Sequence, residues 1–334
     1  GMRGFEDFQD EGTETIAHSE IPETQRYLHE LVPILMRRNK FIYPTDVPNL
    51  PDGILGAAIK AVYPVTEPDR LVSDRYEFEV GGTRFVVLAT PGAEGADALS
   101  LWLPKEKILF SGDTFGPIFP MFPNLTTIRG EKFRFAIPYI ETLDMLIALE
   151  PEMIVPSHFE PVSGKERVHA DLVRMRDAVR YVHDATVEGM NDGKDVYALM
   201  AEIELPPDLE LSQAHGTVPW TVRGIFESYA TWFHFDDTTQ LYAVPARDVY
   251  TDVSALAGAD ALGARAAEYT ASGEPEKALH LAAMALAGEP GNEVALRARL
   301  EALEVLLERS GRVNHHELTW LETRIAETRE TLGD

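Results

Sequence analysis

Short apolar runs that end in turn-forming residues mark the first half of the chain. They lie within residues 13–19, 74–80, 83–90, 100–104 and 107–113. Their β-branched and aromatic content predicts buried strands. A helical pattern covers residues 23–38, and a Pro- and Gly-rich loop comes next at 43–56. Because strand-like and helix-like segments alternate, we expect a layered α/β domain up to about residue 165.

The second half has the apolar spacing of helices. Residues 167–193 carry apolar positions three and four apart and end at a glycine, and shorter helical patterns lie at 195–203 and 222–233. Small and large residues then alternate as in a tetratricopeptide-like helical repeat. They are Ala267, Tyr269, Gly273, Ala278, Ala285, Pro290 and Ala295. Since only about one unit is visible, a helical layer packing on the rest or on a second subunit is favoured over a peptide-binding array.

Charge and composition restrict the partners. The 334 residues include 30 Lys and Arg against 55 Asp and Glu, a formal net charge of -25. The field of such a chain repels polyanions, so nucleic acid and anionic membrane surfaces are not expected partners. No apolar run approaches the roughly 20 residues that span a bilayer. Cysteine is absent, so any metal is held by His, Asp or Glu, and the compartment stays open with the cytoplasm as the default.

Three ligand-type residues come after three predicted strands. Glu94 follows the run at 83–90, Asp113 ends the run at 107–113, and His158 comes after the apolar residues 153–155. Strand ends on one side of a sheet bring their loops together, and hard and borderline cations accept this set of ligands, so the three residues could converge on a metal. The alternative is structural: Glu94 caps a turn, Asp113 binds its own backbone, and His158 is an ordinary loop residue.

A set of motifs along the chain resembles the alkyl sulfatases, a branch of the metallo-β-lactamase superfamily. In order they are TPGAEGADALSLWLP, ILFSGDT, TTIRGEKFR, PSH, MAEIELPPDL and HGTVPWTVRGIFESYATWF. The resemblance implies an α/β domain of the metallo-β-lactamase-like αββα type at residues 1–165, incomplete at its N-terminus. It also implies an all-α dimerisation domain with tetratricopeptide-like helices at 166–334, and hence a homodimer.

The resemblance also assigns roles to single residues. It implies that Glu94 binds one zinc, that Asp113 bridges two zincs and takes part in catalysis, and that His158 binds the second zinc. It implies that Arg129 holds the sulfate group of the substrate, with Arg134 on the same segment. His215 replaces a tyrosine that we associate with the sulfate pocket of the family. A structural ion pair is the alternative role for Arg129.

The first metal-binding motif of that family, H-x-H-x-D-H, does not occur in the sequence. The opening MRGFEDF resembles the segment directly after this motif in the family, so we expect the chain to start just past it. Each zinc would then keep two protein ligands, where a catalytic zinc usually keeps three. We therefore expect the chain to be inactive as it stands. Should it instead bind two zincs tightly and turn over an alkyl sulfate, His18 or His29 would be the first candidates for replacement ligands.

The expected function is that of a metal-dependent hydrolase of sulfate esters, with two zinc ions in the intact protein. Two alternatives stay open: a related hydrolase acting on a phosphoester, thioester or lactone, and a noncatalytic dimeric module. The apolar segment 115–125 also has two interpretations. It lines a channel for an alkyl tail, or it covers the core or a dimer interface.

Overall fold

The computed structural model describes residues 10–42, 67–92, 95–235 and 237–333. The chain forms two compact units. The first comprises residues 1–40 and 44–231, and the second comprises residues 41–43 and 232–334. The sequence predicted a domain boundary between residues 165 and 166. That boundary refers to the family domains and not to these compact units, and it stays a prediction.

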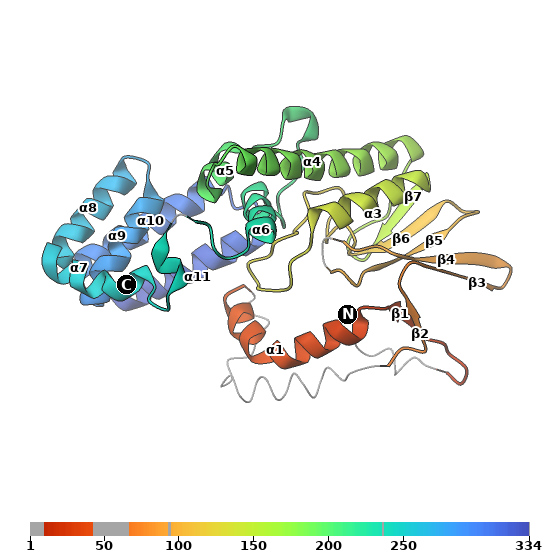
Figure 1. The fold of residues 1–334 in the computed structure, drawn as a ribbon, viewed down its shortest axis with the longest axis horizontal. Helices are drawn as coiled ribbons and strands as arrows, with labels where there is room; N and C mark the ends of the chain where they lie inside the picture. The colour runs from red at the N-terminus through yellow and green to blue at the C-terminus, as the bar shows by residue number, and fades with distance from the viewer. Residues whose placement is uncertain (1–9, 43–66, 93–94, 236, 334) are drawn as a thin grey trace. The chain divides into compact units, whose positions relative to one another are not determined.

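A six-stranded sheet forms the centre of the first unit (Figure 1). Its strands are β3 (Arg75–Val80), β4 (Thr83–Ala89), β5 (Leu99–Leu103), β6 (Ile108–Gly112), β7 (Met153–Pro156) and β8 (Val162–Ser163). They are arranged in sequence order. All neighbours are antiparallel except β6 and β7, which are parallel. The strands predicted within residues 74–113 are thus confirmed.

Helices cover one face of this sheet. A parallel pair needs a crossover connection, and α3 (Ala136–Ala148) supplies it between β6 and β7. The long helix α4 (Lys165–Asn191), which the pattern at 167–193 predicted, packs beside α3 (Figure 1). Alternate strand residues such as Val86 and Leu88 point into the core that these helices close. These residues belong to the same core cluster as residues of α3 and α4, and Val87 between them is buried as well.

The segment before the sheet adds a small parallel pair and a helix. Strand β1 (Ile16–His18) pairs with β2 (Arg70–Val72), and α1 (Ile21–Ile42) comes directly after β1. His18 ends β1, is buried, and accepts a hydrogen bond at Nδ1 from the Glu20 amide at 3.1 Å. The predicted loop at 43–56 lies outside the described residues.

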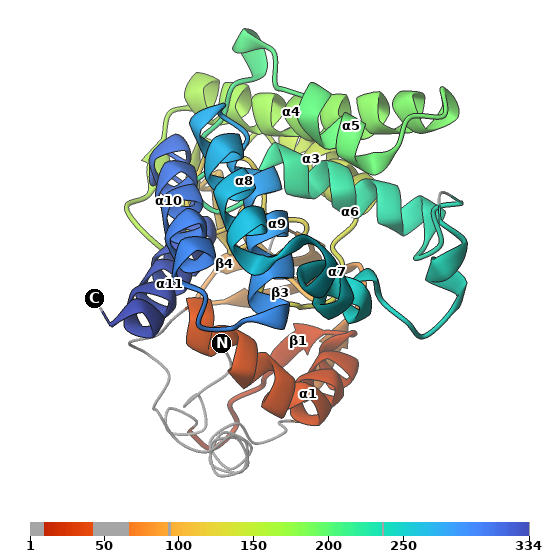
Figure 2. The same ribbon diagram turned by 90° about the vertical axis from the view of Figure 1, so that its left-hand side faces the viewer.

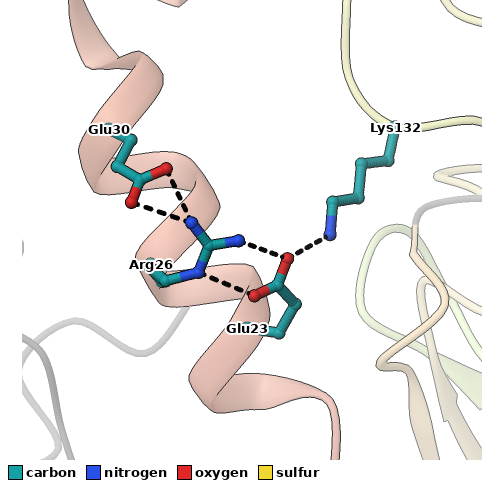
Figure 3. Close-up of polar contacts among 4 residues, drawn as sticks. All are labelled: Glu23, Arg26, Glu30 and Lys132. Carbon is teal, nitrogen blue, oxygen red and sulfur yellow. Dashed lines mark hydrogen bonds and ion pairs between the residues drawn. The ribbon is translucent and has the colours of Figure 1, made fainter.

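Helix α1 is tied to the loop at residues 127–132 by charged groups. Lys132 Nζ donates to Glu23 Oε1 at 2.9 Å, and Arg26 bridges Glu23 and Glu30 (Figure 3). The hydrogen bonds from Arg26 and then Lys132 lower the pKa of Glu23 to about 2. Tyr27 Oη also donates to the Gly130 carbonyl at 3.4 Å. These exposed contacts orient the helix more than they stabilise the fold.

The apolar segment 115–125 is part of the core. Phe115, Phe122 and Leu125 are buried in the same cluster as the sheet and α4. The Phe122 amide donates to the Ser212 carbonyl at 2.9 Å, which fastens the segment to the chain before α6 (Val218–Ala230). Of the two interpretations, the structure therefore favours the one in which the segment covers the core.

The chain between α4 and the second unit is also helical. The predicted helices at 195–203 and 222–233 correspond to α5 (Val196–Glu202) and α6. A short 3₁₀ turn, η2 (Pro207–Leu209), lies between them. Two cap residues explain where the helices begin: the side chain of Asp195 accepts from the amides of the first turn of α5, and that of Thr217 accepts from the Trp220 amide.

The second unit is all-helical. After two 3₁₀ turns, η3 (Thr238–Leu241) and η4 (Ala246–Val249), it contains α7 (Tyr250–Ala257), α8 (Ala259–Ala271), α9 (Pro275–Gly288), α10 (Glu293–Arg309) and α11 (His315–Leu332). Helices α8, α9 and α10 lie side by side (Figure 2). Ala278, Ala285 and Ala295 are fully buried, and their small side chains allow this close approach. The tetratricopeptide-like assignment stays a prediction.

None of the helices in the described ranges is both long enough and apolar enough to cross a membrane.

Gly216 tests the contact between the 115–125 segment and the start of α6. A Cβ atom at this position would lie 2.1 Å from the Pro123 carbonyl oxygen, which is backbone and cannot move aside cheaply. Gly216→Ala should therefore lower the free energy of unfolding by about 1–3 kcal/mol, measured by urea denaturation. Gly291→Ala is the control, because no atom lies within 4 Å of its Cβ position. Equal stabilities of the two variants would contradict the packing described.

Candidate functional site

Asp113 and His158 lie together because β6 and β7 are parallel. Gly112 pairs with Pro156 at the carboxyl ends of these strands. The Ser157 amide also donates to the Gly112 carbonyl at 3.4 Å. The next residues place His158 Nε2 3.5 Å from Asp113 Oδ1. The Ser157 hydroxyl donates to the same carboxylate oxygen, so the Asp113 side chain is oriented by two neighbours.

The Asp113 and His158 side chains remain accessible to solvent. They are 41% and 56% exposed, so a ligand or an ion can reach both groups. Glu94, the third predicted metal ligand, lies outside the described residues. Among the residues that the structure does describe, no group of three or more His, Asp or Glu side chains is close enough to hold a metal ion. The structure therefore brings together two of the three predicted ligands.

The end of β4 reaches the same edge of the sheet. Ala89 of β4 pairs with Leu99, the first residue of β5, and β4 runs in the same direction as β6. The turn after β4 packs tightly here, since a Cβ atom at Gly92 would lie 2.6 Å from the Thr114 carbonyl oxygen. The turn after β4, which leads to Glu94, thus packs against Thr114, the residue after Asp113.

A trio of buried hydroxyl groups fixes these chain ends to one another. Thr90 Oγ1 lies 2.9 Å from Ser100 Oγ and 3.1 Å from Thr114 Oγ1, and the last two are 3.2 Å apart. All three residues are almost fully buried. Buried hydroxyls need partners, and these three supply them to each other. The trio locks the end of β4, the start of β5 and the loop after β6 in one geometry.

The predicted anion-binding arginines form a second cluster, around Glu131. Oε2 of Glu131 accepts from Arg129 Nη2 at 3.2 Å and also from Arg134 Nη2. Arg134 is 4% exposed and donates through Nη1 to the Asn124 carbonyl at 2.7 Å. Arg129 is also largely buried. Two guanidinium groups therefore share one carboxylate, as the structural ion-pair alternative for Arg129 requires. The same arrangement brings several N–H donors close together.

Asn124 belongs to this cluster, although neither the strand ends nor the family motifs point to it. Its side chain is almost completely buried, and neither Oδ1 nor Nδ2 has a hydrogen-bond partner among the residues that the structure describes. Leaving such groups unpaired costs about 1–3 kcal/mol, so an orphaned amide marks a place where a ligand or solvent molecule completes the bonding. The only signal in the sequence is an Asn inside an otherwise apolar run.

His215 and His18 are both buried. His215 directly precedes Gly216, whose backbone contacts Pro123 and Asn124, so His215 lies on the segment that covers the Asn124 loop. For His18, burial lowers the pKa, against the opposing effects of Asp97 and Glu20. Its imidazole is therefore neutral near pH 7, with Nδ1 already used as an acceptor.

Two family sequence models match the chain. Residues 20–158 match the metallo-beta-lactamase superfamily, and residues 196–319 match the alkyl sulfatase dimerisation family. A linear primary-alkylsulfatase from a Pseudomonas species is 32% identical over 234 residues, which are 68% of this chain and 44% of that protein. An (R)-specific secondary-alkylsulfatase from Pseudomonas is 24% identical over 258 residues, 75% of this chain and 38% of that protein. The chain thus spans less than half the length of these relatives.

Solved structures show the same fold. The stereoselective inverting sec-alkylsulfatase Pisa1 from Pseudomonas superposes with a TM-score of 0.78 at 20% identity, over 96% of this chain and 52% of that one. A double mutant of the same enzyme superposes with a TM-score of 0.81, over 98% of this chain and 55% of that one. The alkyl sulfatase resemblance is confirmed: the chain combines a metallo-beta-lactamase-like α/β domain with a helical part that contains an alkyl sulfatase dimerisation domain.

Proposed function

We propose that this chain is part of a metal-dependent hydrolase that cleaves sulfate esters. The observation that carries the proposal is the meeting of Asp113 and His158 at the carboxyl ends of two parallel strands, in a chain with both family matches. The Arg129, Arg134 and Asn124 cluster supports the sulfate ester as substrate. A related hydrolase of phosphoesters, thioesters or lactones stays the alternative, and a panel of these esters separates the two.

Zinc is the proposed metal because carboxylate and imidazole ligands suit it. Asp113 and His158 would contribute one ligand each, and Glu94 is the proposed third. Bound zinc would polarise the ester and activate water. The described residues supply two ligands, fewer than the three that a catalytic zinc usually keeps. That the chain is inactive by itself stays a prediction.

The cationic cluster is the proposed site for the sulfate group. A sulfate ester spreads one negative charge over its oxygens, and guanidinium groups match such an acceptor with paired hydrogen bonds. Arg129 is the proposed principal donor, Arg134 holds the loop through the Asn124 carbonyl, and the Asn124 amide supplies a further N–H. His215 is proposed to line the same pocket.

Metal affinity tests the roles of Asp113 and His158. Asp113→Asn and His158→Ala should each weaken zinc binding more than about tenfold. Even the loss of a residue that only hydrogen-bonds to a metal ligand lowers metal affinity by about tenfold or more. The measurement is the zinc content of the protein after dialysis against buffered zinc. His169→Ala, which removes an exposed histidine of α4, is the control and should change nothing. Unchanged zinc affinity in both site variants would refute the assignment.

Asn124 separates binding from stability. Asn124→Leu removes two unpaired polar atoms at nearly constant volume, so it should raise the free energy of unfolding by about 1 kcal/mol. It should also weaken the binding of butyl sulfate, measured by calorimetry, about tenfold. Thr186→Val is the control: its buried hydroxyl is already satisfied by the Val182 carbonyl, so this variant should lose stability and keep binding. Undiminished binding by Asn124→Leu would exclude Asn124 from the site.

We also propose that the chain forms a homodimer. The dimerisation family match covers residues 196–319, and Trp232 and Phe235 within it are 67% and 88% exposed. Light scattering should report about twice 37.2 kDa. Replacing both aromatic residues by serine should weaken the dimer at least about tenfold, because buried aromatic residues dominate interface energies. Val80→Ser, an exposed apolar residue of β3, is the control. A monomeric wild type at micromolar concentration would contradict the proposal.

A further inference from the structure

We infer that Glu131 tunes the charge selectivity of the anion site, because it lowers the affinity for dianionic phosphate monoesters more than the affinity for monoanionic sulfate monoesters. The inference rests on the proposed function in one respect, namely that the Arg129 and Arg134 cluster binds the anionic group of the substrate. It adds a residue that determines which anions are accepted.

The geometry places the Glu131 carboxylate inside the cluster and not at its edge. One oxygen, Oε2, accepts from both Arg129 and Arg134, and the carboxylate is itself less than one-third exposed. Nearby, Tyr27 has a raised pKa, first because it is desolvated and second because the charge of Glu131 opposes its ionisation. The negative charge of Glu131 therefore acts on a group beside the arginines, against the opposing effects of Lys132 and Arg134.

The effect on ligands follows from charge. Any anion that contacts Arg129 or Arg134 lies close to Glu131 and is repelled in proportion to its own charge. A dianion experiences about twice the repulsion of a monoanion. Attraction to the two arginines doubles as well, so what Glu131 contributes is the difference that its own charge makes. Glu131 therefore penalises a phosphate monoester more than a sulfate monoester of the same shape.

Lys132, the next cation along the chain, does not offset this effect. Its ammonium group is bound by Glu23 of α1 (Figure 3). It also lies over the Tyr27 ring, 5.0 Å from the centroid. The side chain thus points to α1. In the described part of the chain, Glu23 thus binds Lys132, while Glu131 binds both arginines.

The test compares butyl sulfate and butyl phosphate binding to the full chain by calorimetry. At a pH of about 8 the phosphate ester is a dianion, since its second pKa is about 6, while the sulfate ester is a monoanion. Glu131→Gln should shift the ratio of the two affinities toward butyl phosphate by about tenfold or more, the direction set by Coulomb interaction at short range. A loss of arginine positioning alone would weaken both ligands alike.

Two controls and a second measurement complete the experiment. Glu106→Gln removes an equal charge from the exposed β5–β6 turn and should leave the ratio unchanged. Glu131→Asp keeps the charge and should keep the wild-type ratio. Should Glu131→Gln not fold, wild type is titrated at a pH of about 5, where butyl phosphate is a monoanion. Its affinity should then approach that of butyl sulfate, whose charge is the same at both pH values.

The outcomes separate the inference from the proposed function. If butyl sulfate binds but the ratio is the same in wild type and Glu131→Gln, or if the wild-type ratio is the same at both pH values, the selectivity role is overturned and the sulfate site stands. If wild type binds neither ester, the proposed sulfate site fails and the inference fails with it.

Discussion

The parallel pairing of β6 with β7 is the constraint on which the candidate site depends. Antiparallel neighbours would send Asp113 and His158 to opposite edges of the sheet, whereas parallel neighbours end on the same edge. That pairing exists because α3 returns the chain across the sheet and buries its apolar face, including Tyr139 and Leu143, in the common core. A change that weakens the packing of α3 therefore acts on the site, although α3 contributes no residue to it.

A second constraint is the close packing of the segment 115–125 against the chain around Gly216. Its aromatic residues belong to the core, so the loop that continues from Asn124 to Arg134 starts from a fixed point. This arrangement explains how a loop without regular secondary structure can bury an arginine. Arg134 is acceptable in the interior because the Asn124 carbonyl and Glu131 take up its N–H groups.

The sequence predicted the strands and where they end, because β-branched runs followed by turn formers are a local signal. It therefore placed Asp113 and His158 at strand ends. The αββα family resemblance then predicted that the two side chains lie close together. It did not predict that Arg129 and Arg134 share Glu131, or that Asn124 is buried without partners among the described residues. These features depend on contacts between a loop and distant segments, which leave no periodic pattern. The Glu94 prediction and the metal itself stay untested.

The trio of Thr90, Ser100 and Thr114 has a consequence for how this edge of the sheet can evolve. Each hydroxyl both donates and accepts, so the three form a closed ring in which every member depends on the other two. Removing one hydroxyl leaves a buried donor or acceptor without a hydrogen-bond partner. Replacing all three by apolar side chains leaves no such group. Any mutational route from the polar ring to an apolar one thus crosses less stable intermediates, and the three positions are bound to change as a set.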